Sequence, residues 1–172
     1  TAIDLASVTG FKTAGAILID NEVITYTGIS TLTLTGCTRG ADSTTAAAHD
    51  SGAVATQILI DPITTADEST TVTITDTGHG AQTNDWVVLS GAAATGGVTA
   101  ADLNSMAGYQ VTVLTANTYT ITVPSAATST VSAGGGNAVV IKYLVGIAGE
   151  LGAQSSDPAL GWGVGSWGES TW

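Results

Sequence analysis

The feature that most constrains the fold is an alternation at period two, in which threonine alternates with valine, isoleucine or leucine along much of the chain. Successive side chains of a β-strand point to opposite faces, so this pattern places β-branched hydroxyl residues on a solvated face and aliphatic residues on a buried one. Segments with this character are predicted strands: residues 16–19, 53–60, 71–75, 86–89, 110–114, 118–123 and 138–145.

Two connections between strands are predicted from glycine. Residues 22–27 and 31–35 both alternate, and the segment 28–30 (Gly-Ile-Ser) between them predicts a hairpin with a three-residue loop. The triple glycine at 134–136 lacks the Gly-Lys-Ser/Thr that continues a phosphate-binding loop, so a hairpin connection is the better interpretation.

Helical patterns are short. Residues 99–107 predict one or two turns of helix, and residues 44–49 predict one. The predicted fold class is therefore all-β, with two small antiparallel β domains, each sandwich-like or barrel-like, and an extended Gly/Trp-rich C-terminal tail.

Changes in composition divide the chain into three parts. Residues 1–61 form an N-terminal β module, residues 62–145 a second β module richer in Ser, Thr and Gly, and residues 146–172 an extended arm. The first boundary falls at Pro62, whose missing N–H favours a strand edge or a linker.

The C-terminal arm carries Trp162, Trp167 and Trp172, spaced five residues apart among Gly and Ser. An arm of this length is too short to build a core that covers all three rings. They are therefore predicted to be assembly anchors that cross to an adjacent subunit or another protein. The alternative is that they pack back on their own domain.

Charge and length exclude several classes of protein. The chain has 172 residues with 3 Lys+Arg against 14 Asp+Glu, a formal net charge of −11. A nucleic-acid partner is not expected, because phosphates need a Lys/Arg surface. A membrane partner is not expected either, since the sequence holds no run of about 18 apolar residues and opens with no basic-then-apolar signal segment. Cys37 is the single cysteine, which excludes a disulfide framework within the chain.

Residues that carry chemistry are few and scattered. Cys37, His49 and His79 show no spacing typical of a zinc site, and no Gly-x-Ser-x-Gly elbow is present. No catalytic residue, no cofactor and no metal ligand is predicted. Cys37 is expected to be a small buried residue, His49 to tie a loop, and His79 to lie in a turn.

Arg39 is notable because cations are so scarce, and it directly follows a predicted strand. A guanidinium in this place makes paired hydrogen bonds to a carboxylate. Glu22 is the preferred partner, because the predicted hairpin places its strand beside the one that leads to Arg39. The pair is expected to serve structure rather than catalysis. Asp20 and Glu22 share one face of an extended segment, which leaves a bound cation as an alternative for these two carboxylates.

The first module carries four motifs: Phe11-x-x-x-Gly15, Ile19-Asp20-x-Glu22-x-x-x-Tyr26-Thr27-Gly28, Leu34-Thr35-Gly36-Cys37-Thr38-Arg39-Gly40 and Thr45-Ala46-Ala47-Ala48-His49-x-x-Gly52-x-Val54. Together they resemble a small β module that recurs in structural proteins of tailed bacteriophages.

The second module carries Thr77-Gly78-His79-Gly80, Asp85-Trp86-Val87, Tyr109-x-Val111 and Asn117-Thr118-Tyr119-Thr120-Ile121, and the tail carries Trp162-Gly163 and Trp167-Gly168. The motifs of the second module resemble another phage-tail pattern, and the tail is similar to the ends of virion proteins of marine, podovirus-like phages.

These resemblances imply a non-enzymatic virion structural protein, present in several copies at the tail, neck or fibre attachment region. The expected partners are other virion proteins and copies of the chain itself, and the expected location is the exterior of the particle, since packaged DNA would repel an acidic protein.

Three alternatives stay open. One is a capsid decoration protein on the head surface. Another is a carbohydrate-binding adhesin module that recognises a host surface glycan, with Trp86 or Trp162 stacking on a sugar ring. The third is a polysaccharide-degrading hydrolase, which needs a pair of carboxylates in a cleft.

Overall fold

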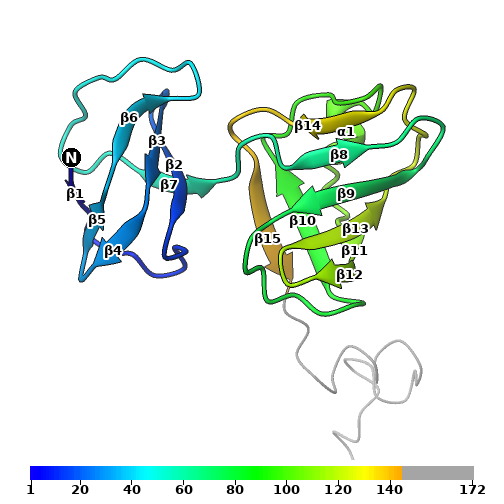
Figure 1. Ribbon diagram of the computed structural model, residues 1–172, viewed down its shortest axis with the longest axis horizontal. Helices are drawn as coiled ribbons and strands as arrows, with labels where there is room; N and C mark the ends of the chain where they lie inside the picture. The colour runs from blue at the N-terminus through cyan, green and yellow to red at the C-terminus, as the bar shows by residue number, and fades with distance from the viewer. Residues whose placement is uncertain (145–172) are drawn as a thin grey trace, which may run out of the picture.

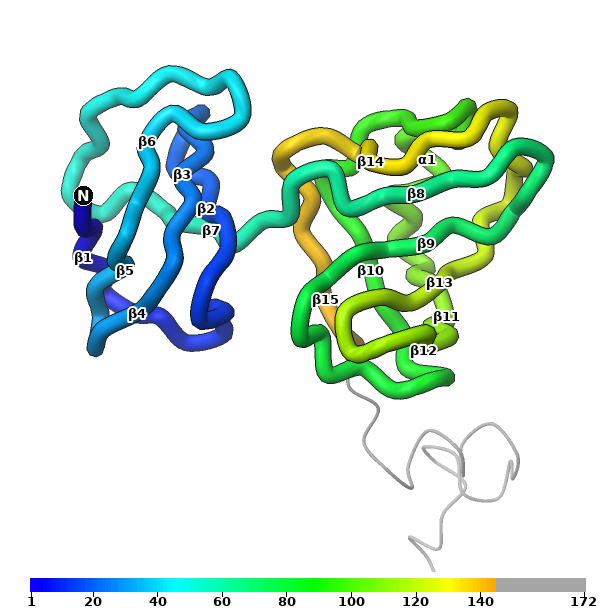
Figure 2. The backbone as a smooth tube through the Cα atoms, viewed as in Figure 1, coloured from blue at the N-terminus to red at the C-terminus, as the bar shows by residue number. Residues whose placement is uncertain are grey.

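The computed structural model describes residues 1–144, and these confirm the all-β class. They form four antiparallel sheets and one short helix (Figure 1). We call residues 1–58 the N-terminal lobe and residues 62–144 the C-terminal lobe. The two lobes lie side by side, and the chain passes between them once (Figure 2).

The N-terminal lobe contains a four-stranded and a three-stranded sheet. The larger has the order β6-β3-β2-β7 and the smaller the order β1-β5-β4. The bounds are β1 (Ile3–Asp4), β2 (Gly15–Ile19), β3 (Glu22–Tyr26), β4 (Gly28–Ser30), β5 (Thr33–Thr35), β6 (Thr38–Ala41) and β7 (Ala55–Ile58). Ile17 and Ile24 of the larger sheet and Leu34 of the smaller one are fully buried in a common cluster, so the two sheets share a core.

The hairpin predicted over residues 22–35 is wrong in its pairing. β4 and β5 form the hairpin, with Thr31 and Leu32 as the turn and Ile29 opposite Leu34. The segment 28–30 is therefore a strand rather than a loop, and β3 pairs with β2 and β6 instead. The turn is possible because Thr31 adopts a φ of 57°. Threonine rarely adopts this left-handed conformation, so the sequence does not predict a turn at this residue.

The C-terminal lobe packs a five-stranded sheet against a three-stranded one. Their orders are β12-β13-β9-β8-β14 and β11-β10-β15. The bounds are β8 (Ile63–Thr65), β9 (Thr71–Thr75), β10 (Trp86–Ser90), β11 (Tyr109–Gln110), β12 (Thr112–Thr115), β13 (Thr118–Thr122), β14 (Val131–Gly134) and β15 (Val140–Leu144).

The alternating pattern sets the faces of the strands in the C-terminal lobe. In β9, Val72 and Ile74 are fully buried, while the flanking Thr71 and Thr75 are exposed. They share a core with Leu89 of β10, on the facing sheet. The predicted partition of hydroxyl and aliphatic residues between the two faces is confirmed here.

The predicted helix near residue 100 is present and short. α1 (Ala100–Leu103) begins after Thr99, whose hydroxyl accepts a hydrogen bond from the Asp102 N–H at 3.0 Å, and it buries Leu103. The second predicted turn, at residues 44–49, is wrong, because that segment is not helical. The backbone N–H of Ala47 instead donates to a side chain of the sheet.

The triple glycine is not a hairpin connection, contrary to the sequence-based expectation. β14 pairs with β8 and β15 pairs with β10, so the glycines carry the chain from one sheet to the other. Gly135 has a φ of 100°, and a Cβ atom there would lie 2.9 Å from Cδ1 of Ile63. Close packing under this crossing explains the glycine better than flexibility does.

The segment that connects the lobes, residues 59–61, is bound to the C-terminal lobe by backbone and side-chain hydrogen bonds. Leu59 forms an isolated β-bridge with Val139, and Asp61 exchanges two 2.9 Å hydrogen bonds with Gly136. Pro62 then leads directly into β8. The predicted boundary at residues 61 and 62 falls in this connection, and the independent folding of the two modules stays a prediction.

Gly91, directly after β10, provides a test of this packing. It has a φ of 74°, and a Cβ atom would lie 2.1 Å from the carbonyl oxygen of Ala138. Gly91→Ala is expected to lower the free energy of unfolding by about 3 kcal/mol or more, since backbone must move. Gly78→Ala is the matched control, with a φ of 64° and open space around its Cβ position, and should cost about 1 kcal/mol of backbone strain alone. Urea unfolding measures both, and equal losses would contradict the close approach.

Candidate functional site

A buried carboxylate at the start of β3 is the centre of the candidate site. Glu22 is 1% exposed. The Arg39 guanidinium donates from Nε to Oε1 at 2.5 Å and from Nη2 to Oε2 at 2.6 Å. The backbone N–H groups of Gly40 and Ala47 donate to the same carboxylate at 2.8 and 3.0 Å. These bonds, with that from Arg39 first, hold the pKa of Glu22 well below its usual range, so the side chain stays ionised.

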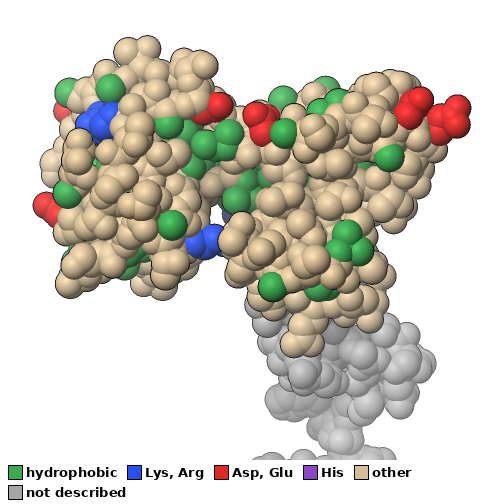
Figure 3. All heavy atoms as spheres, in the orientation of Figure 1, with side chains coloured by type: hydrophobic (Ala, Val, Ile, Leu, Met, Phe, Trp, Pro, Cys, Tyr) green, Lys and Arg blue, Asp and Glu red, His purple; other side chains and the backbone are tan. Residues whose placement is uncertain are grey.

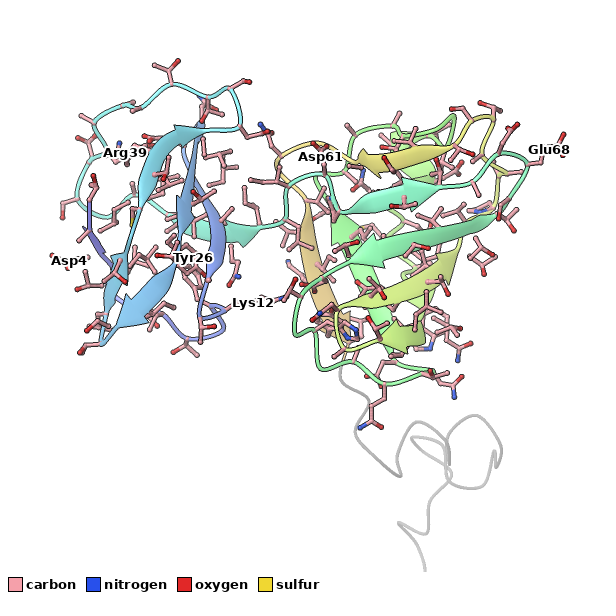
Figure 4. The ribbon with its side chains drawn as sticks, in the orientation of Figure 1. Asp4, Lys12, Tyr26, Arg39, Asp61 and Glu68 are labelled. Atoms are coloured by element: carbon pink, nitrogen blue, oxygen red, sulfur yellow. The ribbon has the colours of Figure 1, made fainter. Side chains whose placement is uncertain are left out.

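The structure brings Arg39 to Glu22, as the sequence predicts, but by a different route. The predicted hairpin does not exist, and Arg39 lies on β6, which pairs with β3 at the edge of the larger sheet (Figure 4). The register is irregular between the pairs Val23–Ala41 and Thr25–Thr38. This irregularity lies on the stretch of β6 that carries Arg39.

The loop after β6 folds back on the same carboxylate. Gly40 has a φ of 60°, and a Cβ atom there would lie 2.9 Å from the backbone nitrogen of Ala46 and 3.0 Å from the carbonyl oxygen of Thr44. Only glycine accommodates both the left-handed conformation and this contact. Arg39 Nη2 also donates to the carbonyl oxygen of Ala47. One charged pair therefore fixes a loop that has no regular structure.

His49 completes the arrangement, which we call the Glu22 cluster (Asp20, Glu22, Arg39 and His49). Its Nδ1 lies 2.7 Å from Oδ2 of Asp20, and its Nε2 lies 2.9 Å from Oε2 of Glu22. Both ring nitrogens face carboxylates, so the doubly protonated imidazolium is the form that donates to both. The hydrogen bond to Asp20, and then that to Glu22, raises the pKa of His49. The imidazole ring thus bridges Asp20 and Glu22, the two carboxylates for which the sequence analysis gave a bound cation as an alternative.

Two hollows adjoin the Glu22 cluster. One, of about 590 Å³, lies between residues 2–6 and 47–53 and is lined by Arg39 and His49. The other, of about 360 Å³, is lined by Asp20, Glu22 and His49. Five donors already converge on Glu22, which offers about four lone-pair positions, so its oxygens are saturated. The cluster is thus suited to holding a loop rather than to moving a proton.

A second ion pair joins the two lobes, and sequence reasoning missed it. Lys12, in the segment before β2, extends from the N-terminal lobe toward the other one (Figure 4). Its ammonium pairs with Asp76 and donates to the carbonyl oxygen of Thr77 at 2.7 Å. The backbone of Lys12 is itself held by Gln57 and Tyr26, at 2.8 Å each.

Asp76 is buried, at 3% exposure, although it is a charged residue directly after β9. Besides the bond from Lys12, its Oδ2 accepts a 2.6 Å hydrogen bond from the hydroxyl of Tyr143 on β15. The scarcity of cations is the one sequence signal that would have drawn attention to Lys12. No local pattern points from residue 12 to residue 76.

Of the two other residues considered for chemistry, Cys37 takes its predicted place and His79 lies just beyond the turn predicted for it. His79 follows a turn formed by Thr77 and Gly78 rather than lying in it; its Nε2–H donates to the carbonyl oxygen of Thr115 at 2.9 Å and its Nδ1 accepts from the Ala81 N–H at 3.0 Å. These partners define the neutral tautomer with the proton on Nε2. Cys37 is buried in the N-terminal core, and burial raises the pKa of its thiol.

Trp86 lies at the start of β10 and is 45% exposed. The three predicted anchors Trp162, Trp167 and Trp172 lie outside the described residues. Within residues 1–144, no group of three or more His, Cys, Asp or Glu side chains is placed to hold a metal ion. No helix in that range is long and apolar enough to cross a membrane.

The fold and the charged residues define a β-rich chain in which two ion pairs hold loops and lobes together. No family model matches the chain, and no curated protein matches it. Among solved structures it is similar to a chain described as phage phi92 endosialidase, with 18% identity and a TM-score of 0.41. The match covers 83% of this chain and 20% of that one, so the chain spans about a fifth of that protein's length. A likeness at this TM-score carries no argument about function.

Arg39→Ala tests the Glu22 cluster. The substitution leaves a buried carboxylate without its main partner, so the free energy of unfolding should fall by about 3 kcal/mol. Lys142→Ala is the matched control, because it removes the same charge from an exposed position on β15, and should change stability by no more than about 0.5 kcal/mol. Chemical unfolding measures both variants. Equal, small effects would contradict the cluster's role in holding the loop.

The raised pKa of His49 predicts a pH dependence of stability. A group whose pKa is higher in the folded state stabilises the fold below its unfolded-state pKa, near 6.5, and loses this effect as the pH rises through the folded-state value. The stability difference between the natural chain and His49→Asn should therefore be larger at pH 6 than at pH 9. Thermal unfolding across this range measures it. His79→Asn is the control, since that ring hydrogen-bonds to backbone groups only. A difference that grows with pH would contradict the bridged imidazolium.

Proposed function

We propose that this chain is a non-enzymatic structural protein of a bacteriophage virion, assembled in several copies through subunit contacts at the tail, neck or fibre attachment region. The observation that carries the proposal is the role of the motif residues. Asp20, Glu22, Arg39, Gly40 and His49 carry the resemblance to a phage structural module, and all five build the Glu22 cluster and its loop. The motif thus describes an architecture rather than a reaction centre.

The state of the ionisable groups supports a structural role. A general base or nucleophile needs a free lone pair, and the Glu22 oxygens are occupied by Arg39, His49 and two backbone N–H groups. Two of the three cations of the chain, Lys12 and Arg39, are engaged in ion pairs that hold the lobes and the loop.

The sheet edges supply surfaces for assembly. β12 is an edge strand of the five-stranded sheet, and its Leu114 is 56% exposed. An edge strand presents unpaired backbone groups that can pair with another chain. Uncharged side chains dominate the face drawn in Figure 3, with few Lys or Arg among them. Such a surface suits contacts between subunits, and the net charge of −11 favours the exterior of a particle over its DNA-filled interior.

The experiment measures copy number and incorporation in particles that carry this chain. Quantitative mass spectrometry of purified virions should give a small, fixed copy number, as expected for a ring or fibre at one vertex. A copy number that follows the capsid lattice would favour the head decoration alternative. Absence of the chain from purified particles would overturn the proposal.

The proposed anchors are tested in the same particles. A chain that ends after Val145, and a full-length chain with Trp162, Trp167 and Trp172 replaced by Ala, should fold but lose oligomerisation or incorporation. Circular dichroism checks folding, and Leu32→Ala, an exposed apolar residue in the N-terminal lobe, is the control. Unchanged incorporation of both variants would overturn the anchor role without touching the virion role.

A further inference from the structure

A hollow of about 470 Å³ lies beside Trp86 on the C-terminal lobe, away from both ion pairs. This volume falls in the range of about 300–1,000 Å³ that is typical of small-molecule sites. Its walls come from the three-stranded sheet and from the ends of β12 and β13, through Gln110, Thr112 and Thr122. The hollow thus combines an aromatic ring with neutral hydrogen-bonding side chains.

Trp86 faces outward although it is the largest apolar side chain of its strand. The following residue, Val87, is fully buried, so the alternation of β10 directs the indole to the opposite face. Trp86 lies directly across from Gln110 of β11 in the antiparallel register, which places the amide next to the ring. Both side chains are exposed. The surface here therefore presents the flat indole ring of Trp86 with the Gln110 amide at its edge.

The floor of the hollow is closely packed. Tyr109 is 7% exposed, and its hydroxyl donates to the carbonyl oxygen of Asp102 in α1. Gly108, the preceding residue, has no room for a Cβ atom, which would lie 2.8 Å from the carbonyl oxygen of Val87. This segment is therefore pressed against β10. A site with a fixed floor loses little conformational freedom when a ligand enters.

The lining selects the class of ligand. Among residues 1–144, none of those that line the hollow is charged. Their side-chain polar groups include the Gln110 amide, the hydroxyls of Ser105, Thr112 and Thr122, and the Tyr109 hydroxyl that donates to Asp102. A charged ligand would find no counter-ion, and an anion would also be repelled by a chain of net charge −11. A stacked nucleotide is disfavoured for the same reason, because its phosphate needs a basic groove.

A neutral sugar ring meets all of these conditions. One face of a pyranose presents C–H groups that pack on an aromatic plate, and its rim presents hydroxyls that pair with amides and hydroxyls. We propose that the hollow beside Trp86 is a binding site for a neutral saccharide, with Trp86 as the stacking platform and Gln110 as the hydrogen-bonding partner at its edge. The inference goes beyond the proposed function, since a structural virion protein needs no such site.

The experiment uses the full chain labelled with ¹⁵N and titrates it with neutral hexoses, N-acetylhexosamines and their short oligomers at millimolar concentrations. The indole N–H signal of Trp86, identified by its loss in Trp86→Phe, should shift saturably with at least one of these sugars. Trp86→Ala should raise the Kd by about tenfold or more, and Gln110→Ala by a smaller factor. Trp86→Phe should retain part of the affinity because it keeps an aromatic face. Val54→Ala, an exposed apolar residue of the other lobe, is the control and should bind as the natural chain does.

Three results would overturn the inference. One is the absence of any saturable shift across the panel, and another is sugar binding that Trp86→Ala leaves unchanged. The third is a change of oligomeric state in Trp86→Ala without sugar binding, which would make this face a subunit contact that includes Leu144, its neighbour on β15. Virion incorporation is measured separately, so failure of the saccharide site and failure of the proposed function are distinguishable.

Discussion

The N-terminal lobe depends on a carboxylate that is removed from water. Burying Glu22 in its ionised form is costly unless charge and hydrogen bonds are supplied within the fold. The cost is offset by Arg39, by His49 and by two backbone N–H groups. Arg39 and Gly40 belong to β6, whereas Ala47 and His49 belong to the loop that follows it. The hydrogen bonds to one carboxylate therefore hold a loop that contains no helix or strand.

The second ion pair acts between lobes rather than within one. Lys12 is held by its own lobe through backbone contacts and reaches Asp76 and Thr77 in the other. The bridge between Leu59 and Val139 and the bonds between Asp61 and Gly136 fasten the connecting segment to the C-terminal lobe. Two of the chain's three cations are therefore engaged inside the molecule, and the outer surface is left polar and acidic.

The sequence was informative where the signal is local. The strands β9, β10 and β13 lie where alternation predicted them, and the Thr99 cap marks the start of α1. The sequence was misleading where the pairing of two strands had to be predicted. β3 pairs with β2 and β6 rather than with β5, and the triple glycine crosses between sheets instead of closing a hairpin. Short strands such as β6, β8 and β14 carry too few alternating residues to be predicted at all.

By itself, the sequence determined which residues face a core, that the chain is all-β, and that its rare arginine needs a carboxylate. The face of a strand follows from periodicity within a short segment, and the expectation of a carboxylate partner for Arg39 follows from the scarcity of cations in the composition, so both can be taken from the sequence alone. Only the tertiary structure decided that Arg39 reaches Glu22 through β6, that Lys12 meets Asp76, and that Trp86 lies across from Gln110. These contacts join segments that are far apart in the sequence. The edge of each strand could pair with several other strands, and the packing of whole sheets selects one of them. A local sequence pattern does not specify which strand is selected.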